Sequence, residues 1–138
     1  LDNLHAAVLN LKLKYYDEDI NRRRNIASIY HELLSKLENI ILPPPPNSDP
    51  LHYDVYQNYE IEVNNREELR LFLTEQGIGT ILQWGGKTLH QFKELGLNND
   101  VPFTEEMSKN FMLLPMHPML SDEDVEYICK QILEFYGA

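Results

Sequence analysis

The segment from Gln83 to His90 combines residue types that could bind an anion. It reads Gln-Trp-Gly-Gly-Lys-Thr-Leu-His, so an aromatic ring, two glycines, an ammonium group and an imidazole lie close together. Glycines leave backbone N–H groups open to approach, and with Lys87 these could hold a phosphate or a carboxylate. The same residues also suit a plain strand-to-helix turn, in which Trp84 belongs to the core and Lys87 is solvated. Trp84, Lys87 and His90 are therefore candidate ligand contacts, with that alternative left open.

A second candidate is His117, which lies between two prolines in the sequence Leu-Pro-Met-His-Pro of residues 114–118. Proline fixes its own backbone, so the flanking prolines hold this histidine in a nearly fixed position. Loop residues held in this way often serve in binding. A rigid connection that carries a surface histidine explains the pattern equally well.

A weaker candidate is the group formed by Gln57 and Tyr59, which follow Tyr53 and Tyr56 on a predicted strand. Their side chains could reach a ligand, but tyrosines of a central strand more often belong to the core. No His-x-x-x-His spacing or phosphate loop occurs, and Gly77-x-Gly79 follows a helix, unlike a dinucleotide-binding fingerprint. The motifs alone argue against a self-contained enzyme.

The elements that must position these candidates begin with a long helix. Residues 2–37 contain no proline or glycine and repeat apolar residues at helical spacing, which predicts one helix or two nearly collinear ones. At the helical rise per residue this segment would span about 50 Å, more than a domain of 138 residues is wide. Part of the helix should therefore pack against something outside this chain.

The remainder alternates short strands and helices. Strands are predicted over 40–42, 53–63, 78–84 and 111–114, and helices over 66–76, 89–95 and 104–110, with a last one after residue 121. Asp2 can cap the first helix, Asn65 with Glu68 and Ser121 with Asp124 are predicted capping pairs, and Gly77 suits a helix end. This order predicts one α/β (α+β) domain over 1–138, with a small, largely antiparallel sheet packed by helices on one face.

Composition narrows the function. The formal net charge of −10 argues against nucleic-acid binding, which requires a positive face. The basic run Arg22–Arg24 follows Asp17–Asp19 and is interpreted as a solvated helix face. No apolar run approaches the roughly 20 residues of a membrane span, and no signal peptide is present, so we expect a cytoplasmic protein. The single cysteine, Cys129, is interpreted as a small buried residue in a reducing compartment.

Four segments, in this order and spacing, resemble the C-terminal domain of the DegT/DnrJ/EryC1/StrS family of nucleotide-sugar aminotransferases. They are Leu-Asp-Asn-Leu-His-Ala-Ala-Val-Leu at 1–9, Asn-Arg-Arg-Arg-Asn-Ile-Ala-Ser-Ile-Tyr at 21–30, Gly-Ile-Gly-Thr at 77–80, and Leu-Pro-Met-His-Pro with Leu-Ser-Asp-Glu-Asp-Val within 114–125. The resemblance covers essentially the whole chain. It implies the small C-terminal domain of the aspartate-aminotransferase fold.

The resemblance also implies a function for the longer protein. Such proteins are homodimers that use pyridoxal 5'-phosphate to move an amino group from an amino acid, typically glutamate, to a nucleotide-linked keto-sugar. Their Schiff-base lysine belongs to a large domain upstream, and the lysines of this chain fall outside that motif, so this chain alone would be inactive. The implied sugar-side contacts are Trp84, Lys87, His90 and His117, with Gln57 and Tyr59 as weaker ones.

Two departures from the family pattern bear on the substrate. Many members have His-Tyr-Pro where this chain has Gln-Trp-Gly-Gly-Lys at 83–87, and a His-x-Tyr-x-Ile strand where it has Gln-Asn-Tyr-Glu-Ile at 57–61. The Trp-Gly-Gly-Lys version resembles the subgroup that aminates C3 of dTDP-linked 3-keto-6-deoxyhexoses. Two other classes of function stay open. One is a stand-alone interaction domain that uses the acidic surface or the prolines at 43–46, and the other is a sugar-sensing regulator without catalysis.

Overall fold

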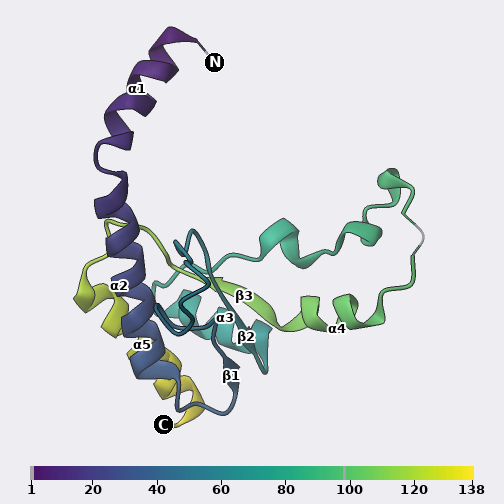
Figure 1. Ribbon diagram of the computed structural model, residues 1–138. Helices are drawn as coiled ribbons and strands as arrows, with labels where there is room; N and C mark the ends of the chain where they lie inside the picture. The colour runs from purple at the N-terminus through teal and green to yellow at the C-terminus, as the bar shows by residue number, and fades with distance from the viewer. Residues whose placement is uncertain (1, 98) are drawn as a thin grey trace.

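The computed structural model describes residues 2–97 and 99–138 (Figure 1). The elements in chain order are α1 (Asn3–Leu13), α2 (Tyr16–Leu34), β1 (Ile40–Ile41), β2 (Tyr59–Val63), α3 (Arg66–Glu75), the 3-10 helices η1 (Gln83–Gly86), η2 (Leu89–Gln91) and η3 (Lys93–Leu95), α4 (Pro102–Asn110), β3 (Phe111–Leu114) and α5 (Asp122–Tyr136). No helix in the described ranges is long and apolar enough to cross a bilayer.

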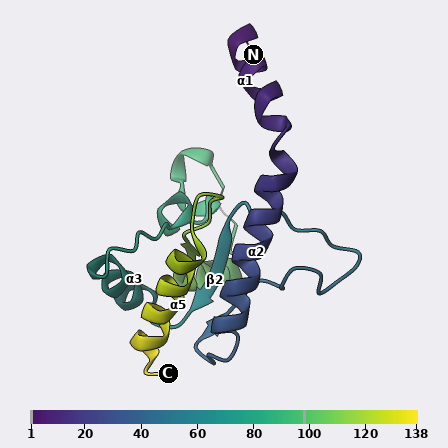
Figure 2. The same cartoon turned by 90° about the vertical axis from the view of Figure 1, so that its left-hand side faces the viewer.

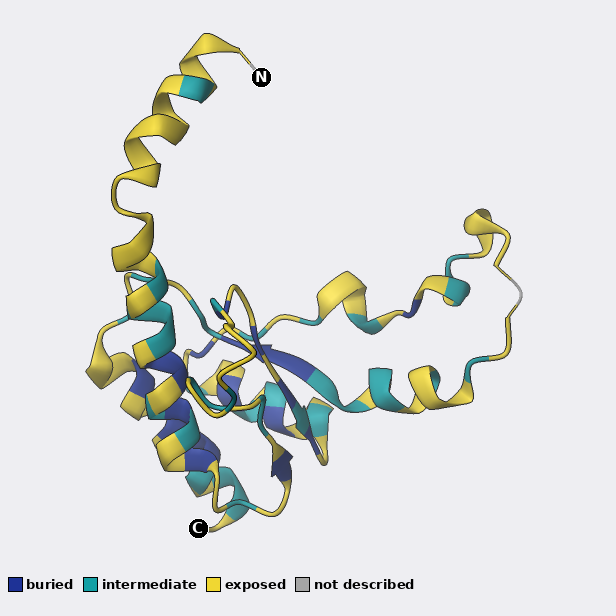
Figure 3. Cartoon of the chain, in the orientation of Figure 1, coloured by how far each residue is buried: buried dark blue, intermediate teal, exposed yellow. Residues whose placement is uncertain are grey.

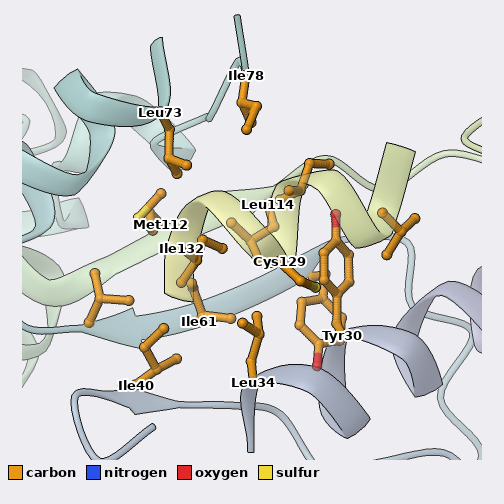
Figure 4. Packing of buried hydrophobic residues seen from close by; sticks show 14 of the residues in the cluster. Tyr30, Leu34, Ile40, Ile61, Leu73, Ile78, Met112, Leu114, Cys129 and Ile132 are labelled. Atoms are coloured by element: carbon orange, nitrogen blue, oxygen red, sulfur yellow. The ribbon is translucent and has the colours of Figure 1, made fainter. Parts of the chain in front are cut away.

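A small antiparallel sheet of order β1-β2-β3 organises the domain. Tyr59 pairs with Leu114, and Ile61 pairs with Met112, so these side chains share one face of the sheet. That face is covered by α2, α3 and α5, whose buried side chains join those of the strands in one apolar core (Figure 4). The sequence prediction of a small antiparallel sheet with helices on one face is confirmed.

The other face of the sheet carries different residues. Strand β2 alternates buried and accessible positions, which places Glu60 and Glu62 opposite the core. Leu113 pairs with Glu60 and lies on the same side, and it is buried without belonging to the main core cluster. This second face, which α2, α3 and α5 do not cover, is called the open face below.

The predicted long helix is two helices. The chain leaves α1 at Lys14 and starts α2 at Tyr16, and the direction of the chain bends between the two helices (Figures 1 and 2). Asp2 caps α1 as predicted, because its carboxylate accepts the backbone N–H of His5 at 2.9 Å. None of the residues of α1 is buried, and Leu4 is 74% exposed (Figure 3). The described residues therefore provide no packing partner that buries α1. Packing of this helix against something outside this chain stays a prediction.

Two strand predictions are corrected. Residues 78–84 form no strand among the described residues, and only Ile81 pairs, with Leu113. The segment turns into η1 at Gln83, so it leaves the sheet before a second pair can form. Strand β2 begins at Tyr59 instead of residue 53, because Tyr56 adopts a left-handed backbone with φ 48° that ends extended pairing.

One predicted cap is absent and another forms. Asn65 has a left-handed backbone with φ 58° and no capping hydrogen bond from its side chain, so the expected pair with Glu68 does not form. Ser121 and Asp124 make the reciprocal capping box at the start of α5, each at 3.1 Å. The backbone N–H of Ser121 lowers the pKa of the Asp124 carboxyl.

Candidate functional site

Residues 83–110, called the arm, leave the domain and return to it (Figure 1). The arm contains the three short 3-10 helices and α4, which runs directly into β3. Only Thr88 is buried among its described residues, while Trp84, Leu89 and Phe103 are 72%, 67% and 77% exposed. The arm thus presents large apolar side chains outside the core.

Three hollows lie along the arm and the open face. The first, of about 350 Å³, is lined by Glu60, Trp84, Lys87 and Ser108 among others. Another, called the arm hollow, has a volume of about 770 Å³. It shares Trp84 and Lys87 with the first and continues to His90. Because the two hollows share Trp84 and Lys87, they adjoin at the Trp-Gly-Gly-Lys segment.

The second hollow, of about 380 Å³, lies where β2 begins and β3 ends. Its lining includes Asn58, Ile81 and His117 and contains neither Lys87 nor His90. The amide of Asn58 donates at 3.5 Å to the side-chain oxygen of Gln83, which lines the first hollow. His117 therefore lies in a hollow of its own, apart from Lys87 and His90.

Trp84 occupies a turn with unusual backbone geometry. Its φ is 54°, and Gly85 and Gly86 follow with φ of 66° and 75°, so three successive residues are left-handed. This conformation costs a residue other than glycine roughly 1–2 kcal/mol, and such strain is concentrated at functional sites. The indole is 72% exposed, so the alternative that Trp84 belongs to the core is wrong. Its ring is available to a ligand.

Arg66, at the start of α3, holds the base of the arm. Its guanidinium donates to the carbonyl oxygens of Ser108 and Phe111, where α4 passes into β3. A β-carbon on Gly86 would lie 3.7 Å from a guanidinium nitrogen of Arg66 and 3.3 Å from a methyl group of Leu82. Arg66 therefore fastens the end of the arm where α4 meets β3, and its guanidinium lies close to Gly86 at the beginning of the arm. Local sequence patterns could not predict this role, because the contacts join segments far apart in the chain.

Lys87 carries an accessible positive charge beside the first hollow and the arm hollow. Its side chain is exposed, and its ammonium nitrogen lies 5.9 Å from the centroid of the Phe92 ring. No ion pair involves Lys87 in the described part of the chain. An anionic ligand in either adjoining hollow could therefore pair with it as with a point charge.

His90 makes contacts within the arm. Its Nε2 lies 2.6 Å from a carboxylate oxygen of Glu105 on α4, and its Nδ1 lies 3.0 Å from the hydroxyl of Thr88. Only 15% of the imidazole is exposed. Both ring nitrogens already have partners, so this histidine ties η2 to α4 and shapes the wall of the arm hollow.

The loop that carries His117 is fastened to α2. The hydroxyl of Tyr30 donates to the carbonyl of Pro115 at 2.8 Å, and Arg22 donates to the carbonyl of Leu120 and to Asp122. Arg23 donates to the carbonyl of Met116 at 3.2 Å. The sequence interpretation of the three arginines as a solvated face is wrong, because their side chains are half-buried and bind backbone oxygens of distant loops.

Gln57 and Tyr59, the weaker candidates, are placed differently from each other. Gln57 is exposed at the end of the loop before β2. Tyr59 is 1% exposed and its ring packs on Tyr30, with 4.8 Å between ring centroids. The structure thus places Tyr59 in the core, away from all three hollows. Sequence reasoning missed Asn58 and Glu60, the polar residues that β2 and its leading loop direct to the open face.

Comparison with known proteins identifies the family. The family model described as "DegT/DnrJ/EryC1/StrS aminotransferase family" matches residues 1–133. The chain belongs to this family. The resemblance of the four sequence segments is therefore confirmed, and so is the small α+β domain that it implied.

Curated family members and solved structures are similar over nearly the whole chain. A "pleiotropic regulatory protein" of Geobacillus stearothermophilus is 34% identical over 99% of this chain. The dTDP-3-amino-3,6-dideoxy-alpha-D-galactopyranose transaminase of Aneurinibacillus thermoaerophilus is 29% identical over 96% of it. A family aminotransferase from Brucella abortus covers all of it with a TM-score of 0.87 and 30% identity, and DesV from S. venezuelae does so with 0.88 and 26%.

The chain matches only part of the length of each relative. The chain spans 37% of the length of the Geobacillus protein and 36% of the Aneurinibacillus transaminase. It also spans 36% of the Brucella structure and 37% of the DesV structure. The chain therefore corresponds to about a third of each family member named here.

The lysines bear on the cofactor that the family implies. Covalent attachment of pyridoxal phosphate needs a lysine whose amine is activated, typically in a desolvated pocket. All lysines in this chain are exposed: Lys12, Lys14, Lys36, Lys87, Lys93, Lys109 and Lys130. The exposed lysines of this chain therefore do not fit the covalent attachment site, and the placement of that lysine in another domain stays a prediction.

Proposed function

We propose that this chain is the small C-terminal domain of a pyridoxal-phosphate transaminase that aminates a nucleotide-linked keto-sugar. The amino donor is an amino acid, with glutamate expected, and the full-length enzyme is a homodimer. The observation that carries the proposal is the exposed, left-handed Trp84 beside Lys87, whose charge has no acidic partner among the described residues, in a chain of this family. Without the large domain and its lysine, this chain has no catalytic activity.

The substrate proposed is a dTDP-linked 3-keto-6-deoxyhexose. The Gln-Trp-Gly-Gly-Lys sequence supports this choice, as does the similarity to a transaminase whose name gives a dTDP-3-amino-3,6-dideoxy sugar. Such a substrate carries a diphosphate and a planar base beside the sugar. Lys87 pairs with a phosphate or sugar oxygen, and the exposed indole of Trp84 offers a flat apolar surface beside it.

The remaining site residues have different proposed roles, which follow from where each residue lies. His90 holds the arm in shape through Glu105 and Thr88, and so keeps the hollow around Lys87 open. His117, which shares its hollow with Asn58, contacts the sugar, and Gln57 lies at the end of the neighbouring loop. Tyr59 supports this arrangement from the core.

Substitution of Lys87 tests the sugar-nucleotide role. In the enzyme that joins this chain to its cofactor domain, Lys87→Ala should raise the KM for the keto-sugar about tenfold or more, since one charge-assisted contact is lost. Turnover at saturation should change less. The matched control is Lys93→Ala, because Lys93 is also an exposed lysine of the arm but lines none of the three hollows. A KM that stays the same in Lys87→Ala would remove this residue from the site.

The names of two relatives favour a second function. The Geobacillus relative is named a pleiotropic regulatory protein, and another relative, 29% identical, is named a sensory transduction protein. The alternative is therefore a regulator of the same fold that binds a nucleotide-sugar without aminating it. Isothermal titration with a dTDP-sugar, alongside a transamination assay, separates the two, because a regulator shows binding and no amino transfer.

A further inference from the structure

We propose that Arg23 is a positioning residue that fixes the Gln57 and His117 segments relative to each other. The nitrogen Nη1 of Arg23 donates to the carbonyl oxygens of Tyr56 at 3.3 Å, Gln57 at 3.0 Å and Met116 at 3.2 Å. Its acceptors thus come from the loop before β2 and the loop after β3. The two loops are about 60 residues apart in the sequence, and one guanidinium group joins them.

These loops need such a link because the sheet has already ended. The last pair between β2 and β3 joins Tyr59 to Leu114, and the two loop segments beyond it are not paired in the sheet. Tyr56 has a left-handed backbone, which turns its loop away from the ladder. Carbonyl groups that leave a ladder must find other donors or water. Arg23 supplies these donors at the point where the ladder stops.

The neighbouring side chains of α2 each hold one loop only. Tyr30 and Arg22 bind the carbonyls of Pro115 and Leu120, both in the loop after β3. Arg24 binds the carbonyl of Asp54 and the side chain of Asn47, both before β2. Among the described residues, Arg23 is therefore the one side chain of α2 with hydrogen bonds to both loops.

The consequence for binding follows from where the side chains lie. Arg23 holds backbone atoms from the helix-covered side, and the side chains of Gln57 and His117 remain exposed. A shift of about 1 Å in a positioning group can cost about a hundredfold in rate. The role in sugar binding rests on the proposed function, whereas the link between the two loops does not.

The link is tested first on the chain itself. Arg23→Gln keeps a polar side chain but shortens it and removes the charge, and Arg24→Gln is the same change one residue away. In Arg23→Gln, the carbonyl ¹³C chemical shifts of Tyr56, Gln57 and Met116, measured by NMR, should all move from their values in the unmodified chain, because these three oxygens lose charge-assisted hydrogen bonds. Arg24→Gln should leave the carbonyl shift of Met116 unchanged. A Met116 carbonyl shift that is the same in both variants overturns the proposal.

Kinetics then tests what the link is for. In the enzyme with its cofactor domain, Arg23→Gln should raise the KM for the keto-sugar about tenfold and leave the KM for the amino-acid donor within about twofold. Arg23→Lys should recover part of the loss, because an ammonium group still offers three donors. A lower active fraction with unchanged KM values would show general misfolding and overturn the positioning role.

The two proposals can fail separately. If the unmodified enzyme aminates no nucleotide-linked keto-sugar, the proposed function fails, and the carbonyl chemical shifts still decide whether Arg23 links the loops. If the enzyme is active but Arg23→Gln changes neither these chemical shifts nor the KM for the sugar, only the role of Arg23 is refuted.

Discussion

Two stacked tyrosines in the core should respond in opposite directions to loss of the hydroxyl group. Tyr30 and Tyr59 are 0% and 1% exposed, and their ring centroids lie 4.8 Å apart. The hydroxyl of Tyr30 donates to the carbonyl of Pro115 at 2.8 Å. The hydroxyl of Tyr59 is buried and finds no partner among the described residues. The same substitution, tyrosine to phenylalanine, therefore removes a hydrogen bond at one position and an unpaired polar group at the other.

The expected magnitudes follow from what each change leaves behind. Tyr30→Phe removes the hydrogen bond to the partly buried carbonyl of Pro115, which should cost about 1–3 kcal/mol of unfolding free energy. Tyr59→Phe removes a hydroxyl that is desolvated without compensation, so it should be neutral or stabilise the fold by about 1 kcal/mol. The two variants should differ by about 1–4 kcal/mol, with a central value of about 2 kcal/mol.

Urea unfolding of the 138-residue chain, followed by circular dichroism, measures this difference. With a urea dependence of about 2 kcal/mol per molar, the midpoints of the two variants should lie about 1 M apart. The reasoning is refuted if Tyr59→Phe destabilises the chain as much as Tyr30→Phe does. That result would mean that the hydroxyl of Tyr59 has a partner, such as a buried water, and that the core around it is arranged differently.

Three further predictions concern glycine, cysteine and pH. Gly86→Ala should cost about 1–2 kcal/mol in urea unfolding because its φ is 75°, whereas Gly79→Ala, with no atom within 4 Å of the new carbon, should be neutral or slightly stabilising. Burial raises the pKa of the Cys129 thiol to about 12, so Ellman's reagent should modify it only as fast as the chain unfolds, and fast labelling in native buffer would contradict this. Burial also raises the pKa values of Tyr30 and Tyr59, so the native state keeps protons that the unfolded state releases. Stability should therefore be retained up to about pH 9 and fall above it, and a urea midpoint that rises from about pH 9 to about pH 11 would contradict this.

Local patterns predicted the parts of the fold that local interactions determine. The capping box of Ser121 and Asp124, the cap at Asp2 and the end of α3 near Gly77 depend on residues a few positions apart. The sequence therefore contained both partners of each contact within one short window. The strand at 78–84 failed for the opposite reason, because a strand needs a neighbour along its length and only Ile81 has one.

The sequence predicted which residues belong to the site better than it predicted how they are arranged. Trp84, Lys87 and His90 were chosen from their local sequence, and the structure gathers them around adjoining hollows. Their division of roles was not predictable, because the partner of His90 is Glu105, on another helix. Arg23 was misinterpreted for the same reason, since its three acceptors lie 33, 34 and 93 residues away.

The proposed place of this chain on the sugar-nucleotide side of a transaminase site is tested by amino transfer. The full-length enzyme, with its cofactor bound and glutamate as donor, is assayed with a panel of nucleotide-linked keto-sugars. We expect that a dTDP-linked 3-keto-6-deoxyhexose is aminated and that this chain expressed alone aminates none. Absence of amino transfer to every sugar of the panel, from an enzyme shown by its absorbance to hold the cofactor, would contradict it.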